Sequence, residues 1–359
     1  MIGRYFRYEL KKNLKTLGLL TAICTIIYVV VTSTAALFYD YSPTWIDYGT
    51  AAGSGAPNYF VGNVRNNSPQ ISIIYQLLGA MCFVVPALMY SFKMNRRSAD
   101  AFYSLPIKRE KLYLVKTLVG LILVFVPYTV AYVAGLLCIA FRENYYNLIW
   151  YLPGYFGGVF YGLCLYGIAA FSFARANRVA DGVIFIIFYA LVGLMGGEVL
   201  RQISYELNMF DVNESVFFPV FCFSDFAGNI DQLIRGAYLA GKVPPGGGTG
   251  VSFNFFEFFF PLLYTVAGFA LLLLLPRFDK GEDAEQYSDS WFGYRVMIPL
   301  YTALFIALYG VDILTIILFT VAAIVMTIIY RRKALFSWQY WVMIAAGVLA
   351  GIVLNLIIF

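Results

Sequence analysis

The residue types that usually carry catalysis are scarce in this chain. It has no histidine, which removes histidine metal ligands, proton relays and hydrolytic triads. Its five cysteines are scattered and show neither a disulfide framework nor metal-ligand spacing. No G-x-x-x-x-G-K-[ST] motif occurs, and the glycine-rich PPGGGTG lacks the lysine that grips phosphate. We therefore expect no enzyme activity, no metal site and no ATP site in this chain.

Charged side chains beside apolar segments are the next candidates, because an ionisable group inside a membrane is costly and usually functional. Glu198, Glu257 and Asp312 lie near one end of their segments, and Arg175 and Asp181 flank a short polar break. We interpret all five as solvated residues at the membrane surface. No apolar segment has an acid clearly at its centre, which argues against an ion-coupled carrier.

The most informative polar segment is KMNRRSADAFYSLPIKREKLYLVK, residues 93–116. Residues 98–105 predict a short amphipathic helical turn with an aromatic tip. Pro106 ends it, because proline has no N–H to donate within a helix. Arg109, Lys111 and Lys116 then accompany the return to an apolar segment. From the residues alone, this is either an interfacial loop with anchoring cations or a surface that binds a partner.

The pattern D-x-F-Y-S-L-P-I-x-R-x-x-L-Y-L-V-K in this loop resembles the first cytoplasmic loop of ABC transporter type 2 permeases, the exporter-type membrane subunits of bacterial ABC systems. In that family the loop holds the coupling helix, which docks on a separate ATPase subunit. The resemblance implies this coupling role for residues 93–111. The matching positions are Asp100, Phe102, Tyr103, Ser104, Leu105, Pro106, Ile107, Arg109, Leu112 and Lys116.

The resemblance also implies partners. ATP and Mg would bind in the partner ATPase rather than in this chain, and a second copy or a homologous permease would complete the transporter. The substrate would be amphipathic: a peptide, a lipid-like compound or a drug. RFDKGEDAEQY, residues 277–287, is similar to a cytoplasmic segment of some of these permeases, and is either a second ATPase contact or a solvated loop.

Apolar blocks dominate the rest of the chain. Of 359 residues, 61% are hydrophobic and only 13% are charged, and a helix needs about 20 mostly apolar residues to cross a membrane. As one helix, 296–330 would be about 52 Å long, so we divide it at Gly310-Val311-Asp312. The chain is predicted to be an all-α polytopic membrane protein, with spans at 17–39, 71–92, 112–140, 153–174, 182–200, 255–275, 296–310, 313–330 and 338–359.

The positive charges predict the orientation. With the N-terminus in the cytoplasm, five of the 25 lysines and arginines fall outside and the other twenty inside, as the positive-inside rule requires. These cations suit anionic lipids and an ATPase surface, so no nucleic acid is expected. We read the first span as retained rather than as a signal peptide. The protein is thus expected in the cell membrane, with its C-terminus outside.

This topology divides the chain into regions that the resemblance names. The six-span permease core is expected at 17–275, with the coupling loop at 93–111 inside it. The three helices at 296–359 go beyond the six-span pattern. This suggests a subfamily with extra helices that is similar to Gram-positive permeases. The remaining segments are a cytoplasmic amphipathic N-terminal helix (1–16), an external loop (40–70), an external segment (201–254) and a cytoplasmic loop (276–295).

Small and aromatic residues inside the spans suggest further roles. Gly154, Gly158 and Gly162 recur every four residues, as in close helix packing, either within the bundle or at a dimer face. Tyr128 and Tyr132 lie one helical turn apart and either line a substrate path or bond to a neighbouring backbone. An ion-coupled carrier, a channel, or a non-transporting sensor or anchor remain alternatives to the exporter.

Overall fold

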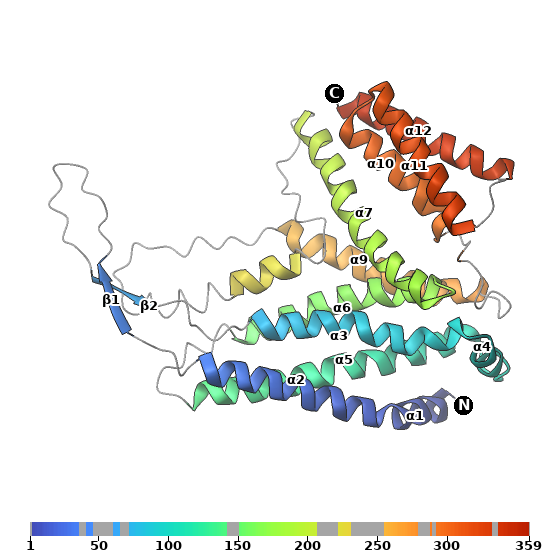
Figure 1. Ribbon diagram of the computed structural model, residues 1–359. Helices are drawn as coiled ribbons and strands as arrows, with labels where there is room; N and C mark the ends of the chain where they lie inside the picture. Colours follow the sequence, from blue (N-terminus) through green and yellow to red (C-terminus); the bar gives the residue numbers. More distant parts are fainter. Residues whose placement is uncertain are drawn as a thin grey trace, which may run out of the picture.

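The computed structural model describes residues 2–35, 41–45, 60–64, 72–141, 151–206, 222–230, 255–278, 288, 292–331 and 337–358. Helices dominate this part of the chain (Figure 1). They are α1 (Ile2–Lys12), α2 (Leu14–Ala35), α3 (Ser72–Tyr90), α4 (Arg96–Tyr103), α5 (Arg109–Ala140), α6 (Tyr151–Arg175), α7 (Val179–Glu206), α9 (Phe255–Leu274), α10 (Tyr294–Tyr309), α11 (Ile313–Arg331) and α12 (Trp338–Ile358). Short 3₁₀ turns, η2 (Ser91–Met94) and η5 (Leu275–Phe278), extend α3 and α9.

The described helices have the length and composition of membrane spans. Seven of them, α2, α3, α5, α6, α7, α11 and α12, are long and apolar enough to cross a bilayer, and shorter apolar helical stretches are Phe258–Leu274 in α9 and Tyr294–Tyr309, which is α10. Ile313 and Leu314 on α11 are more than three-quarters exposed, which is unfavourable in water and favourable in hydrocarbon. The protein is an all-α polytopic membrane protein, as predicted.

The division of 296–330 into two helices is present in the structure. Helix α10 ends at Tyr309 and α11 begins at Ile313. Between them Gly310 has φ of +102°, a conformation that side-chain-bearing residues avoid because Cβ would clash with the backbone. Glycine at this position therefore permits the tight reversal.

Part of the predicted loop at 40–70 is instead a β-ribbon. Strand β1 (Tyr41–Trp45) pairs antiparallel with β2 (Phe60–Val64), with Pro43 opposite Gly62. Aromatic and β-branched residues favour strands, and Pro43 is tolerated because each strand of a two-stranded ribbon has an unpaired edge. The loop prediction is wrong for these ten residues because the glycines and prolines around them dominated the pattern.

The helices form two groups (Figure 1). Helices α2, α3, α5 and α6 lie side by side, with α9 against α6, while α10, α11 and α12 gather beside α7. Helix α12 packs closely on α10, since a Cβ on Gly347 would lie only 2.5 Å from the Pro299 carbonyl oxygen. Further along, Asn355 Nδ2 donates to the Ala307 carbonyl at 2.9 Å. Close backbone approach and a buried amide thus hold α12 against α10.

The core of the first group is rich in tyrosine. Eight tyrosines are almost fully buried in the described residues: Tyr28, Tyr75, Tyr90, Tyr113, Tyr128, Tyr151, Tyr161 and Tyr166. Their hydroxyls need partners in an apolar interior, and several bond to neighbouring helices. Tyr90, for example, shares a 2.7 Å hydrogen bond with Thr117. These side chains join α3, α5 and α6 rather than forming only a belt at the membrane surface.

Residues 222–230, within the predicted external segment 201–254, form a further helix in the structure. Phe223 and Phe226 pack edge-on against Tyr75 of α3, and Ile230 is buried. The apolar positions 223, 226, 227 and 230 have the spacing of one helical face. That periodicity is the signal by which the sequence could have revealed this helix. Residues 201–206 continue α7, so the predicted segment begins inside a helix.

Candidate functional site

Helix α4 lies at the end of the bundle where α3 ends and α5 begins (Figure 1). Asn95 caps its N-terminus: the side-chain oxygen accepts from the Arg97 backbone N–H at 3.1 Å. The Ser104 N–H bonds back to the Asp100 carbonyl at 3.0 Å, and Pro106 follows two residues later. These local signals explain why the loop 93–111 contains one short, well-defined helix.

The predicted coupling residues divide between the two faces of this loop. Asp100, Ser104 and Pro106 are exposed. The apolar members, Phe102, Tyr103, Leu105 and Ile107, are half-buried and pack against the main core. Arg109 lies with its guanidinium 4.9 Å from the Tyr103 ring. The predicted aromatic tip therefore points mainly into the protein, and the exposed face of α4 is formed by Arg96, Arg97, Asp100, Ala101 and Ser104.

An aromatic cluster fixes α4 to its neighbours. The rings of Phe102 and Phe92 are 4.8 Å apart, and Phe92 also lies 6.1 Å from Tyr113 of α5. The hydroxyls of Tyr103 and Tyr113 are 3.3 Å apart. Because Phe92 belongs to η2, these contacts join the end of α3, helix α4 and the start of α5. Helix α4 is thus connected to α3 through Phe92 and to α5 through Tyr113.

A buried ion pair lies beneath this cluster. Lys116 Nζ of α5 is 3.0 Å from Glu9 Oε2 of α1, and both side chains are almost wholly buried. Glu9 Oε1 also accepts from the Tyr5 hydroxyl at 2.9 Å. The ammonium of Lys116 lies 4.6 Å from the Phe102 ring and 5.0 Å from the Phe92 ring, a cation–π arrangement. Lys116 therefore contacts α1, η2 and α4 from its place on α5.

Burial and the neighbouring Glu9 carboxylate raise the pKa of Tyr5 well above its usual value. Tyr5 accordingly stays protonated and keeps donating to Glu9 over the physiological range. Sequence reasoning recognised Lys116 but missed Glu9. The available signal was that Glu9 is the one acidic residue among the five cations of 1–16, four residues after Tyr5 on the same helical face.

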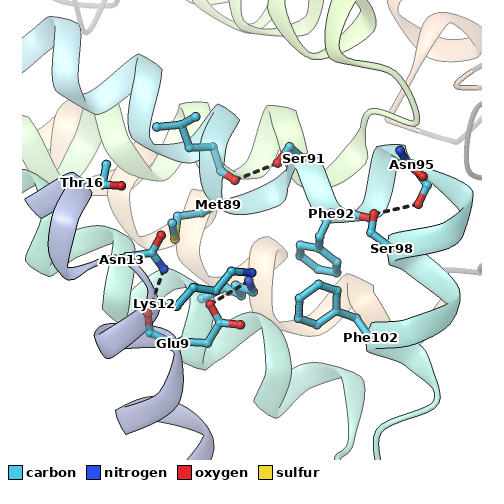
Figure 2. A pocket seen from close by; sticks show the side chains of 12 residues that line it. Glu9, Lys12, Asn13, Thr16, Met89, Ser91, Phe92, Asn95, Ser98 and Phe102 are labelled. Carbon is cyan, nitrogen blue, oxygen red and sulfur yellow. Dashed lines mark hydrogen bonds and ion pairs between the residues drawn. The ribbon is translucent and has the colours of Figure 1, made fainter.

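A cavity of about 560 Å³ opens between α1, α2, α3, η2, α4 and α5. Figure 2 shows Glu9, Lys12, Asn13 and Thr16 on one side and Phe92, Ser98 and Phe102 on the other. Its volume is within the range of small-ligand pockets.

Tyr128 and Tyr132, the candidates for a substrate path, are both buried. The Tyr132 hydroxyl donates to the Tyr151 carbonyl at 2.7 Å, and the Tyr128 hydroxyl to the Tyr155 carbonyl at 3.3 Å. Tyr128 and Tyr155 also stack, with ring centroids 5.5 Å apart. In this structure the two tyrosines join α5 to α6 by backbone bonding, the alternative that the sequence left open.

Gly154, Gly158 and Gly162 face other helices of the same chain. A Cβ on Gly154 would lie 2.7 Å from Tyr75 Oη, and one on Gly162 would lie 3.1 Å from Leu78 Cδ2, both on α3. A Cβ on Gly158 would collide with the Tyr128 hydroxyl on α5. The glycine stripe thus lets α6 pack between α3 and α5, within the bundle.

The expectation of solvated charges is wrong for Asp181 and Arg175, which are both buried. Asp181 Oδ2 accepts from Ser288 at 2.7 Å, and Oδ1 accepts from the Tyr294 hydroxyl at 3.1 Å. Ser288 Oγ in turn accepts from the Asn177 N–H at 2.9 Å. The carboxylate is buried because chain segments more than 100 residues away fold over it, which local sequence does not reveal. This network joins the α6–α7 turn to α10.

The other charged sites are simpler. Glu198 pairs with Arg201 of the same helix at 2.8 Å, and Asp312 is exposed. The side chain of Glu257 and most of the segment 277–287 lie outside the described residues. Among the residues that the structure describes, no group of three or more histidine, cysteine or acidic side chains is placed to hold a metal ion.

These features place a fixed amphipathic helix, a buried ion pair and a mixed polar and apolar cavity at one end of a multi-pass membrane protein. Comparisons with protein-family models, with curated proteins and with solved structures find no match to this chain.

Proposed function

We propose that this chain is the membrane-spanning subunit of an ATP-driven exporter, and that a separate ATPase docks on α4. The observation that supports this most is the placement of α4. It is a short helix between two long apolar helices, with its apolar face packed on the core and its polar face exposed. A rigidly held surface of this kind can pass a partner's movement into the bundle.

The contacts of α4 suggest the route of that movement. Phe102 rests on Phe92 at the end of α3, and Tyr103 lies against Tyr113 on α5. Lys116 extends the connection to α1 through Glu9. Displacement of α4 would therefore tilt α1, α3 and α5 together, which is the type of motion that alternating access requires.

The remaining parts of the proposal follow from the loop's resemblance to type 2 permeases. ATP and Mg would be bound and hydrolysed in the partner ATPase, and a second permease chain would complete the transporter. The N-terminus and α4 would lie in the cytoplasm and the C-terminus outside the cell membrane, in keeping with the distribution of lysine and arginine. The transported compound would be amphipathic.

The test uses the exposed face of α4, because substitutions at Phe102 or Leu105 would also disturb the packing of the loop. The tagged full chain is purified from its native membrane, and any co-purifying subunit with a P-loop is identified and its ATPase activity measured. We expect Asp100→Lys and Ala101→Glu each to reduce the recovered ATPase at least tenfold. Ser337→Glu, an exposed change just before α12, is the matched control and should leave recovery unchanged.

Two results would contradict the proposal. One is a purified chain that brings down no P-loop subunit under conditions in which the chain is folded and abundant. The other is full recovery and normal ATPase stimulation with both α4 variants. Either would favour a carrier, channel, sensor or anchor instead.

A further inference from the structure

The cavity between α1, α2, α3, η2, α4 and α5 has a polar side and an apolar side. Its polar side includes Lys12, Asn13 and Thr16, and its apolar side includes Leu88 and Phe92. Figure 2 shows the polar side chains of α1 and α2 facing Phe92 and Phe102 across it. A ligand that fits both sides must be amphipathic.

The cavity lies at the level where the apolar stretches of α2 and α3 give way to polar residues. Helix α2 begins at Leu14, and α3 ends at Tyr90. Leu88, which lines the cavity, is half exposed on the membrane-spanning part of α3. Phospholipid headgroups occupy this level of a bilayer. An acyl chain could therefore leave beside Leu88 while its headgroup stays in the cavity.

The charges of the cavity favour an anion. Lys12 and Lys116 line it together with Glu9. Glu9 balances Lys116, since the two form a buried ion pair, which leaves Lys12 as the uncompensated charge among the lining residues. Lys12 is exposed, and its ammonium lies 5.6 Å from the Phe102 ring at the cavity wall. One phosphodiester would complement this single positive charge.

The serines of the cavity favour a headgroup that carries hydroxyls. Ser91 donates its hydroxyl to the Leu88 carbonyl at 2.9 Å, and Ser98 donates to the Phe92 carbonyl at 2.6 Å. With these protons engaged, both oxygens present lone pairs as acceptors. A headgroup with free hydroxyls can donate to them, whereas a choline headgroup cannot and would bring a positive charge towards Lys12.

We propose that this cavity binds one anionic glycerophospholipid of the phosphatidylglycerol type, with its phosphate on Lys12, its headgroup hydroxyls on Ser91 and Ser98, and its acyl chains beside Leu88. The proposal is independent of the exporter function, because it concerns a lipid held by α1, α3, η2 and α4 whether or not an ATPase docks.

The test compares neighbouring cations on α1. The purified full chain is placed in phosphatidylcholine nanodiscs, and binding of a fluorescent phosphatidylglycerol is titrated, with fluorescent phosphatidylcholine as the reference lipid. Lys12→Glu is compared with Lys11→Glu, because Lys11 is also exposed on α1 but does not line the cavity. We expect about a tenfold loss of affinity with Lys12→Glu and no more than about a threefold loss with Lys11→Glu. A tenfold loss corresponds to about 1.4 kcal/mol of binding free energy.

A second variant removes space without changing charge. Thr16→Trp fills the cavity, and it should abolish phosphatidylglycerol binding while the melting temperature of the protein stays within a few degrees of the parent. Leu19→Trp, at an exposed position of α2 outside the cavity, should bind normally. Millimolar inorganic phosphate should not compete, because the site also requires the acyl chain.

Three outcomes would overturn the proposal. Equal losses with Lys11→Glu and Lys12→Glu would show general attraction to a basic surface. Equal binding of phosphatidylcholine would show that the cavity has no preference for an anion. Unchanged binding by a folded Thr16→Trp protein would show that the lipid lies elsewhere.

Discussion

At the scale of single residues, Lys116 has the most varied contacts in the candidate site. Its ammonium meets the Glu9 carboxylate and the faces of Phe92 and Phe102. Removing two charges from water costs free energy. Close pairing and further hydrogen bonds, such as the one from Tyr5, must offset that cost. The pair therefore stabilises the fold only when α1, η2, α4 and α5 hold these groups in their observed positions.

Substitutions of the two buried charges should have non-additive effects on stability. Glu9→Gln or Lys116→Met alone should each reduce stability by about 3 kcal/mol, because the partner charge stays buried without compensation. The double variant should lose clearly less than the sum of the two. Thermal unfolding in a fixed detergent, followed by intrinsic fluorescence, measures the four proteins of the cycle. Losses that simply add would show that the two charges are not coupled in the folded protein.

At the scale of elements, α6 depends on small residues that allow close approach. Gly154, Gly158 and Gly162 lie every four residues and meet side chains of α3 and α5. The two tyrosines of α5 use that space to reach the carbonyls of α6. Helix association in a membrane relies on such packing and on interhelical hydrogen bonds, since lipid is as apolar as the helices.

Gly158→Ala should therefore destabilise the bundle, because its new methyl group would collide with the Tyr128 hydroxyl. The expected fall in melting temperature is several degrees, and Tyr128→Phe in the same chain should restore part of it by removing that oxygen. Gly196→Ala on α7 is the matched control. A Cβ there meets nothing within 4 Å, so it should be neutral or stabilising by up to about 1 kcal/mol. Equal melting temperatures for the Gly158 and Gly196 variants would contradict the packing argument.

At the scale of the whole molecule, two helical groups meet through α7. The buried Asp181 carboxylate binds Ser288 and Tyr294, so the start of α7 is joined to the start of α10. Around the same end of the second group, Tyr294 stacks on Tyr330 at 4.8 Å, and Arg331 lies 4.2 Å from the Tyr340 ring. These contacts connect the start of α7 with the start of α10, the end of α11 and the start of α12.

The charge distribution predicts that these ends face the cytoplasm. Single cysteines at Gly3, Asp312 and Ser337 test it in a Cys138→Ser background, because the other four native cysteines are buried. In intact cells a membrane-impermeant maleimide should label only Asp312→Cys, and the other two should react after permeabilisation. Labelling of Ser337→Cys from outside would reverse the orientation of the α11–α12 connection and remove the support that topology lends to the exporter proposal.

Much of the architecture follows from local properties of the sequence. A helix is present over each of the nine predicted apolar segments, because the length of an apolar run and the demand for internal backbone hydrogen bonds leave few alternatives in a membrane. The helix break at Gly310 and the helix end before Pro106 could also be predicted from the sequence, because each depends on the backbone chemistry of one residue. Residues 222–230 also have apolar residues at helical spacing, but the aromatic residues around them obscured that spacing.

The contacts that these helices make with one another are determined only by the tertiary structure. The sequence shows that Phe102 is aromatic and that Glu9 and Asp181 are acidic, but the directions in which they point depend on which helices pack beside them. Glu9 meets Lys116 across more than 100 residues, and Asp181 is covered by residues equally distant. Local patterns report propensity and periodicity over one or two turns, whereas burial, ion pairing and cavity shape arise only when separate helices come together.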